Sequence, residues 1–269
     1  MKPLQDTFPD APLPPPDPYR QADPAPAAPG PAESWLGAGF GVRTVWTGLV
    51  IALAIVFLLT IAAVGALEAI EPDASDREKL WAGFLTTLVI DLLALVTLPI
   101  MLLGGGRRAL ARLGFRRPAA RDLGWGIAGL VGAMAVVWLY VGIVEVAGVE
   151  DLEPVSSIDN DAIYASVGLI VLTGILVVLV APIAEEIFYR GFLFAGLGRR
   201  FGVVAGALAS SALFAAVHFD PGSLIPFAVV GVVFALVYWR SRSLNGAILA
   251  HGLFNAISFV VLVFDRGVG

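Results

Sequence analysis

The chain has 269 residues, of which 58% are hydrophobic and only 14% are charged. Soluble domains carry roughly 25% charged residues, and the mean hydropathy is +0.86, so a soluble cytoplasmic enzyme is excluded. The net charge of −5 at pH 7 gives no reason to expect nucleic-acid binding. The absence of cysteine excludes disulfides, thiolate catalysis and cysteine-ligated metal sites, but it leaves a carboxylate and histidine site open.

The first 34 residues differ in kind from the rest of the chain. Eleven of the eighteen prolines lie between Pro3 and Pro31, interspersed with Ala, Asp and Gln. Such a segment lacks apolar periodicity and backbone donors, so we expect a disordered, partly polyproline-II tail on the cytoplasmic side. A proline-rich ligand for a partner module is the alternative. No apolar stretch follows the start, so the segment does not resemble a secretory signal peptide.

Seven apolar runs follow, and we expect them to cross a bilayer, which takes about 20 helical residues each. The runs cover residues 45–67, 80–103, 123–148, 163–198, 203–219, 224–239 and 244–264. The fourth run is too long for one straight span, so we expect a bend at Gly174 or Pro182, or two joined helices. The sequence therefore predicts an all-α, polytopic membrane bundle of about seven or eight transmembrane helices, with the first three in residues 35–162.

The distribution of cations predicts the orientation. Residues 104–122 contain six arginines, and short cytoplasmic loops carry the excess of Lys and Arg. This loop and the amino terminus should therefore be cytoplasmic, with the acidic loops and the carboxyl terminus on the other side. Binding of the loop arginines to anionic lipid head groups is the alternative. Arg outnumbers Lys 15 to 2, which indicates a GC-rich bacterial genome and hence a bacterial cytoplasmic membrane.

A cluster of ionisable residues lies inside the fourth apolar run. An ionisable residue at the centre of a membrane helix costs about 2.5–3.5 kcal/mol, so it needs a reason. Glu186 and Arg190 are four residues apart and share a helix face, which predicts an ion pair. Glu185 points about 100° away from Glu186, so we do not expect both to face one partner, and Glu185 is left to face a cavity. The alternative is a salt-bridged helix end at the membrane interface.

Both histidines of the chain lie in apolar runs. His218 stands beside Asp220 and Pro221 near the end of the fifth run, where a simple interfacial role is also open. His251 and Asn255 are four residues apart in the seventh run and share one helix face.

These residues allow two kinds of chemistry. Glu185, His218 and His251 could form a three-ligand zinc site with an open position for water. Without metal, the glutamate could act as a general base on water, assisted by a histidine. In that case His251 and Asn255 would donate hydrogen bonds to an oxyanion.

Three motifs occur in order on the fourth, fifth and seventh predicted membrane helices. They are Glu185-Glu186-x-x-x-Arg190, Phe214-x-x-x-His218 and His251-x-x-x-Asn255. This set resembles the CPBP family, the CAAX-protease and bacteriocin-processing intramembrane endopeptidases, also called the Abi family. The resemblance covers the later helices and identifies residues 163–269 as a CPBP-like catalytic core.

The resemblance implies a function as well as a fold. It implies an endopeptidase that hydrolyses membrane-associated peptides or proteins within the bilayer, with Glu185 as the water-activating carboxylate and His218 as the second catalytic group. Glu186 and Arg190 would be structural companions of Glu185, and the third motif would complete the site. The family is described both as metal-dependent and as glutamate-based. A noncatalytic membrane scaffold or bacteriocin-immunity factor with the same fold is the alternative, and a proton-coupled transporter is a further one.

One other polar residue lies deep in an apolar run. Asp91 is in the middle of the second run, with Thr86, Thr87 and Thr97 nearby. This setting favours a helix–helix hydrogen bond over a catalytic role.

Overall fold

The computed structural model describes residue 36 and residues 39–154, 161–164 and 167–266. The predicted proline-rich tail of residues 1–34 lies outside this part. The described residues form helices and no strands, so the predicted all-α fold is confirmed. The elements of the first half are α1 (Val42–Ile70), α2 (Asp76–Ile90), η1 (Asp91–Thr97), α3 (Leu98–Leu102), α4 (Gly106–Arg112), α5 (Ala120–Ala147) and η2 (Glu150–Leu152).

The second half continues with a long helical body and three further helices. Its elements are α6 (Asp161–Tyr164), α7 (Val167–Ile175), η3 (Leu176–Val180), α8 (Ala181–Glu185), η4 (Glu186–Phe194), α9 (Ala195–Phe201), α10 (Val203–Ala216), α11 (Pro221–Ser241) and α12 (Leu244–Arg266). The segments η1, η3 and η4 are π-helical, and η2 is a short 3₁₀ turn. From Val167 to Phe201 the fourth apolar run is thus one continuous helical body, and its first π segment lies between the two expected bends.

Six helical bodies in the described part of the chain are long and apolar enough to cross a membrane. They are Val42–Ile70, Arg77–Leu102, Ala120–Ala147, Val167–Phe201, Pro221–Ser241 and Leu244–Phe264. The chain is therefore an integral membrane protein. The fifth predicted run is the exception, because α10 has only 14 residues. At 1.5 Å per residue it is about 21 Å long, against about 30 Å of hydrocarbon.

The early end of α10 has a local cause in the sequence. Phe219 adopts a left-handed backbone with φ 53°, which stops a right-handed helix. Asp220 then caps α11, because its side chain accepts hydrogen bonds from the N–H groups of Gly222 and Ser223 at 3.2 and 3.1 Å. Pro221 occupies the first turn of α11, where its missing N–H costs nothing. The apolar run therefore contains a turn that hydropathy alone does not reveal.

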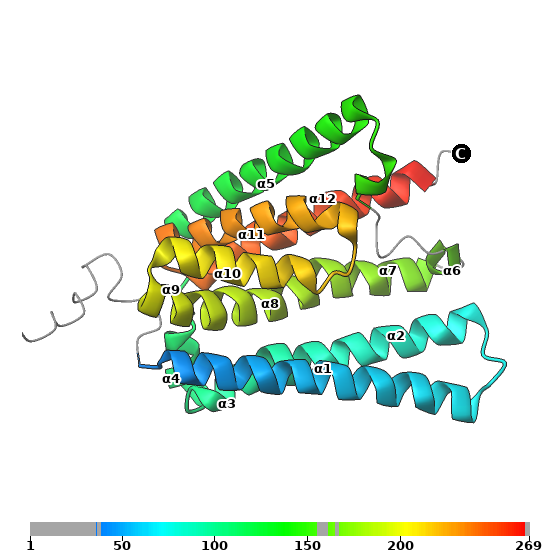
Figure 1. Ribbon diagram of the computed structural model, residues 1–269, viewed down its shortest axis with the longest axis horizontal. Helices are drawn as coiled ribbons and strands as arrows, with labels where there is room; N and C mark the ends of the chain where they lie inside the picture. The colour runs from blue at the N-terminus through cyan, green and yellow to red at the C-terminus, as the bar shows by residue number, and fades with distance from the viewer. Residues whose placement is uncertain (1–35, 37–38, 155–160, 165–166, 267–269) are drawn as a thin grey trace, which may run out of the picture.

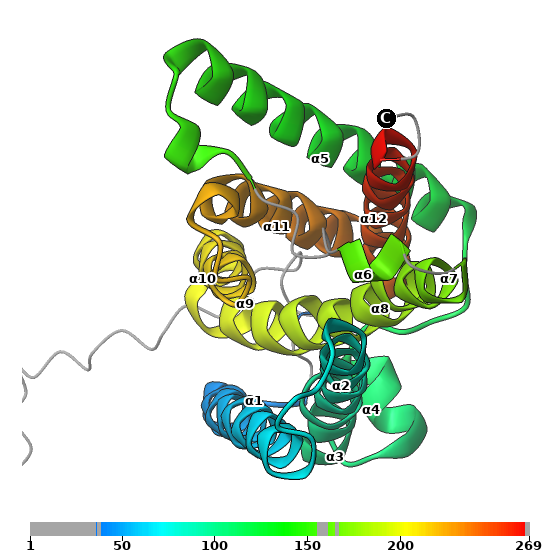
Figure 2. The ribbon, with the colours of Figure 1, turned by 90° about the vertical axis from the view of Figure 1, so that its right-hand side faces the viewer.

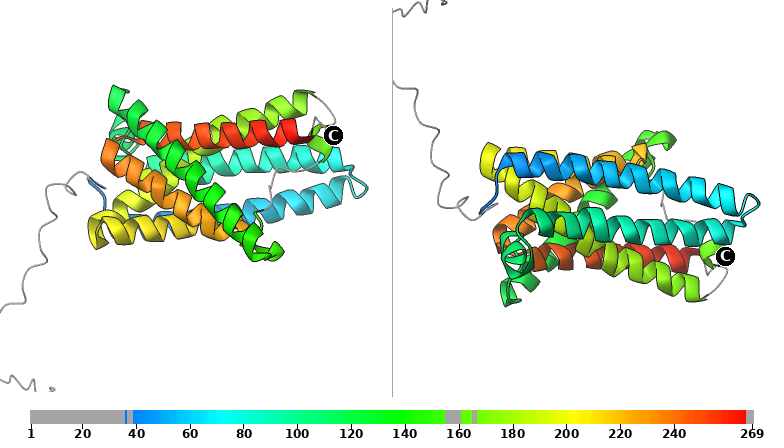
Figure 3. Two further views of the ribbon diagram at one scale, coloured as in Figure 1. Left: turned by 90° about the horizontal axis from the view of Figure 1, so that it is seen from above. Right: turned by 90° about the horizontal axis from the view of Figure 1, so that it is seen from below.

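The long body of α7 to α9 lies in the middle of the bundle. Figure 2 shows α1 to α4 on one side of it and α10, α11, α12 and α5 on the other. Helix α5 packs across α11 and α12, as the view from above in Figure 3 also shows. All nine residues of η4 are buried. A helix that is buried on every side lies at the centre of a bundle. Glu186 and Arg190 of the predicted ionisable cluster therefore lie at this centre.

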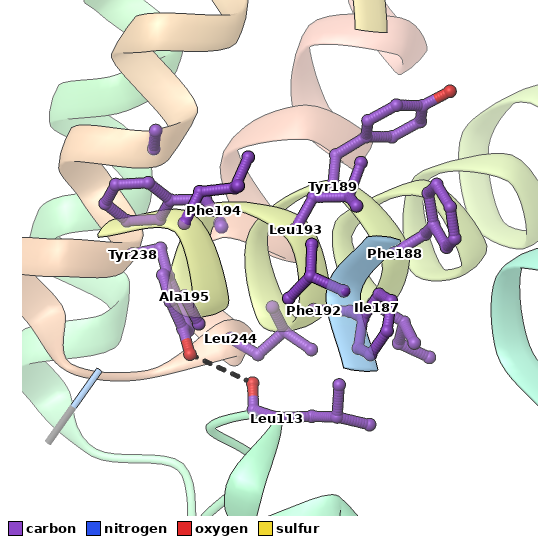
Figure 4. Close-up of a cluster of buried hydrophobic side chains, with 14 of the residues drawn as sticks. Leu113, Ile187, Phe188, Tyr189, Phe192, Leu193, Phe194, Ala195, Tyr238 and Leu244 are labelled. Carbon is purple, nitrogen blue, oxygen red and sulfur yellow. Dashed lines mark hydrogen bonds between the residues drawn. The ribbon is translucent and has the colours of Figure 1, made fainter. Parts of the chain in front are cut away.

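The core around η4 fixes this segment on several sides. Phe192 and Phe194 are fully buried, and Figure 4 shows the surrounding side chains. Tyr238 donates a hydrogen bond from its hydroxyl to the Leu113 carbonyl at 3.2 Å, which ties α11 to the loop after α4. A Cβ on Gly191 would lie 2.9 Å from the same carbonyl oxygen, so glycine is needed for this close approach. The segment that carries Glu186 and Arg190 is therefore held in place by a tightly packed core.

Candidate active site

One cavity gathers four of the six predicted site residues. Its volume is about 490 Å³, and Glu185, His218, His251 and Asn255 all line it. They come from α8, from the turn between α10 and α11, and from α12. Figure 1 shows that this turn ends partway along the bundle, short of the outer ends of α7 and α12. The short α10 therefore explains how His218, at the end of its apolar run, shares a cavity with His251, near the start of its own.

The other two predicted residues form a buried ion pair next to this cavity. Arg190 Nη1 lies 2.9 Å from Glu186 Oε1, and both side chains are fully buried. This is the pair that their spacing of four predicts. Arg190 also donates to the Gly231 carbonyl at 3.3 Å. Its guanidinium lies 4.6 Å from the centre of the Phe214 ring, which adds a cation–π contact.

His251 stands between the two adjacent glutamates. Its Nδ1 lies 2.9 Å from Glu186 Oε1, and its Nε2 lies 3.6 Å from Glu185 Oε2. A carboxylate oxygen accepts, so Nδ1 carries the proton and Nε2 presents a lone pair. The expectation that the two glutamates face different partners is therefore wrong. The two nitrogens of an imidazole lie on different edges of the ring. One histidine can therefore contact two glutamates that point about 100° apart on a helix.

Glu186 Oε1 consequently has two partners, the Arg190 guanidinium as an ion pair and His251 Nδ1 as a hydrogen-bond donor. The ring of His251 is stacked against Phe234, with ring centres 4.9 Å apart. These contacts fix the orientation of the imidazole and the direction of its free nitrogen. A second group that orients a histidine in this way is a common feature of both catalytic and metal-binding histidines.

His218 is fixed by the end of the preceding helix, α10. Its Nδ1 lies 2.8 Å from the Phe214 carbonyl oxygen, which can only accept, so Nδ1 is the donor and Nε2 is free for another contact. The imidazole makes edge contacts with Phe214 and Phe227, with ring centres 5.0 and 4.8 Å apart. Both histidines therefore carry the proton on Nδ1, which leaves Nε2 of each ring available to accept a hydrogen bond or to bind a metal.

Asn255 donates a hydrogen bond to a backbone carbonyl that lacks its usual helical donor. The donor is missing because the residue that would supply the N–H is a proline. In η3 the N–H of Ala181 donates to the Leu176 carbonyl, five residues back. The same π register would pair the Val177 carbonyl with residue 182, but Pro182 has no N–H. Asn255 Nδ2 donates to that carbonyl instead, at 2.9 Å. The second hydrogen of this amide remains for another acceptor.

The donor chemistry of the site suits zinc. Two histidines with free Nε2 atoms and one carboxylate are a ligand set of zinc enzymes, and the Nδ1 contacts are the usual support. As the side chains lie, no group of three or more His, Cys, Asp or Glu in the described ranges is arranged to hold a metal ion. Zinc binding by Glu185, His218 and His251 stays a prediction.

Asp91 is a cavity residue that the sequence did not reveal. It lines the same cavity as Glu185, and only 7% of the residue is exposed. Within the described part of the chain its carboxylate has no hydrogen bond or ion pair, so the expected helix–helix hydrogen bond is not present. Phe84 and Thr87 line the cavity from the same helix. A carboxylate in an apolar run is itself a signal for a site, but the run does not show which neighbour it faces.

The comparisons with known proteins agree with the motifs. Residues 167–257 match the family described as type II CAAX prenyl endopeptidase Rce1-like. The chain is 30% identical over 190 residues to "Putative membrane peptidase YdiL" of Bacillus subtilis, covering 69% of this chain and 72% of that protein. It is 33% identical over 97 residues to an uncharacterized protein of Mycoplasma capricolum, covering 35% of this chain and 28% of that one. No solved structure matches the chain.

Proposed function

The chain belongs to the CPBP family of CAAX-protease-like membrane proteases, and from this premise we propose that it is an intramembrane endopeptidase. It would hydrolyse peptide bonds of membrane-associated peptides or proteins in the lipid bilayer. The observation that carries the proposal is the cavity itself. Glu185, His218, His251 and Asn255 line one space, while the fully buried pair of Glu186 and Arg190 stands next to it.

In the proposed reaction, Glu185 is the general base. It takes a proton from a water molecule, the water oxygen bonds to the carbonyl carbon of the peptide, and a tetrahedral oxyanion forms. When the carbon–nitrogen bond breaks, the proton passes from Glu185 to the departing nitrogen. The free Nε2 of His218 accepts a hydrogen bond from the attacking water and so helps to orient it. Glu185 is suited to the role because it has no arginine partner of its own in the described residues, whereas Glu186 does.

The oxyanion would be stabilised from α12. Asn255 has one N–H engaged by the Val177 carbonyl, and the other can donate to the developing negative charge. His251 has its Nδ1 proton bound to Glu186, so it can donate to the oxyanion only after Nε2 receives a proton. Glu185 Oε2 lies 3.6 Å from this nitrogen, and a small side-chain rotation would let the two share the proton taken from water.

A zinc ion is the alternative to this mechanism, and Glu185 then acts as a metal ligand and not as the general base. Glu185, His218 and His251 would hold it, and the metal would lower the pKa of a bound water and polarise the carbonyl of the peptide. The roles of the two Nδ1 contacts would be the same in either case, because they hold each imidazole with Nε2 toward the cavity.

The proposed orientation places the amino terminus in the cytoplasm of a bacterial cell. Figure 1 shows α4, the start of α1 and the end of α9 at the same end of the bundle. Arg107, Arg108 and Arg112 lie in α4, and Arg199 and Arg200 lie in α9. This clustering of cations at one end supports the assignment of that end to the cytoplasmic side.

The test of the function is Glu185→Gln. Glutamine keeps the volume and hydrogen bonding but removes the basic carboxylate, so proteolysis should be abolished while thermal stability in detergent is retained. Activity is measured as cleavage of a library of fluorescence-quenched apolar peptides in liposomes. The control is Glu145→Gln, at an exposed position of α5, which should leave both properties unchanged. Full activity of Glu185→Gln would contradict the proposal and favour the noncatalytic scaffold or immunity factor.

A further inference from the structure

Part of the cavity wall comes from the amino-terminal hairpin, which is formed by α1 and by α2 with its continuation η1. Phe84, Thr87 and Asp91 all line the cavity, and their spacing places them on one face of α2 as it continues into η1. The segment η1 packs directly against α8 and η4, which carry the two glutamates. Asp91 lies well outside the region 167–257 that matches the family, so its presence in the cavity needs its own explanation.

A buried carboxylate without a partner is costly. Asp91 is 7% exposed, and in the described part of the chain no donor reaches its carboxylate. The Arg190 guanidinium is already paired with Glu186 at 2.9 Å. Asp91 therefore presents a carboxyl group without a protein partner to the cavity that the substrate would occupy, so a peptide that enters can supply its hydrogen-bonding partner.

The proposed reaction creates such donors. A peptide in a bilayer satisfies its backbone N–H groups within a helix, and it must unwind around the bond that is cut. The unwound N–H groups then lack acceptors in a low-dielectric environment. On the cavity wall Glu185 is committed to the water in the proposed mechanism, whereas Asp91 has no other task.

We infer that Asp91 is a substrate-binding residue whose carboxylate accepts hydrogen bonds from backbone N–H groups of the unwound peptide next to the scissile bond. This inference rests on the proposed function and extends it, because it assigns part of the substrate site to the amino-terminal hairpin. Thr87, one turn earlier on the same face, offers a hydroxyl oxygen toward the same segment of peptide.

The test compares Asp91→Ala and Asp91→Asn on the peptide that the wild-type protein cleaves best from the quenched library. A lost hydrogen bond to a charged acceptor corresponds to roughly a 10- to 100-fold rise in KM for Asp91→Ala. Asparagine keeps an acceptor oxygen, so Asp91→Asn should raise KM only a few-fold. The kcat should be unchanged in both, because the contact is made equally in the ground state and the transition state. The same peptide should bind Glu185→Gln carrying Asp91→Ala more weakly than Glu185→Gln alone, by the same factor.

The matched control is Asp122→Asn, because Asp122 is also a buried carboxylate, 4% exposed. It accepts from the Ala119 N–H at 2.9 Å at the start of α5 and is absent from the cavity lining. This variant should retain KM, and its thermal stability should change little because asparagine also offers an acceptor oxygen to the Ala119 N–H.

Each other outcome is decisive. An unchanged KM in Asp91→Ala, a fall in kcat at constant KM, or equal damage from alanine and asparagine overturns the inference. If Glu185→Gln is inactive while both Asp91 variants match the wild type, only the inference fails. If the wild type cleaves no peptide in the library, the proposed function fails and the inference fails with it.

Discussion

Replacing either member of the buried ion pair should destabilise the protein strongly. The pair of Glu186 and Arg190 is separated by 2.9 Å with no exposed side-chain area. At an effective dielectric constant of about 20, two unit charges at this distance attract by about 6 kcal/mol before desolvation is counted. Measured losses for breaking buried pairs are about 3–5 kcal/mol, because one charge is left without a partner. We expect this loss for Glu186→Gln and for Arg190→Met.

The double variant separates the stability of the pair from its role in the site. Glu186→Gln with Arg190→Met removes both buried charges together, and such replacements are often close to neutral. The double variant should therefore be more stable than the sum of the single variants predicts, by about 2–3 kcal/mol. Activity should not recover fully, because the neutral amide oxygen of glutamine is a weaker acceptor for His251 Nδ1 than the Glu186 carboxylate that lies 2.9 Å from it.

The measurements are equilibrium unfolding in detergent and cleavage of the quenched peptide library for all four proteins of the cycle. Glu145→Gln again serves as the control at an exposed position and should change stability by less than about 0.5 kcal/mol. The reasoning is refuted if the single variants lose less than about 1 kcal/mol, or if the two losses simply add. Recovery of full activity in the double variant would refute the positioning of His251 by Glu186.

Two further predictions concern zinc and the backbone around Asn255. In the zinc form of the site, purified active protein should contain about one equivalent of zinc, lose activity to a strong chelator and regain it with zinc, whereas less than about a tenth of an equivalent with chelator-resistant activity would rule zinc out and leave the glutamate base. Pro182→Ala restores an N–H that competes with Asn255 for the Val177 carbonyl, so turnover should fall roughly 10- to 100-fold from misplacement of the amide. Because a proline is removed from a helix, stability should stay the same or rise, and unchanged turnover would contradict this account of Asn255.

The sequence predicts most of the helices because the physics of the bilayer is local. A run of about 20 apolar residues is sufficient to identify a span, and six spans are found where such runs occur. The fifth run does not form a helix of spanning length, and the reason is also physical. Its apolar character continues through Val217 and Phe219, so hydropathy passes over a turn made by the positive φ of Phe219 and the cap at Asp220.

The parts of the site that depend on packing between distant helices could not be predicted. The pair of Glu186 and Arg190 follows from a spacing of four on one helix. The contact between Glu186 and His251 joins residues 65 positions apart, and the entry of Asp91 into the cavity depends on how η1 packs against α8. The partner of Asn255 has a signal in hindsight, because Pro182 frees a carbonyl in a π register, but the register itself is set by the packed helix.

The adjacent glutamates show how such packing changes a chemical assignment. The angle of about 100° between neighbouring helix positions suggests a division in which Glu186 serves Arg190 and Glu185 serves the substrate. The structure contains the pair of Glu186 and Arg190 and adds a link that the angle did not suggest, since His251 meets Glu186 with Nδ1 and faces Glu185 with Nε2. Arg190 therefore does more than stabilise its own helix. Arg190 holds Glu186, Glu186 fixes the tautomer and direction of His251, and the free nitrogen of His251 lies beside the carboxylate proposed to activate water.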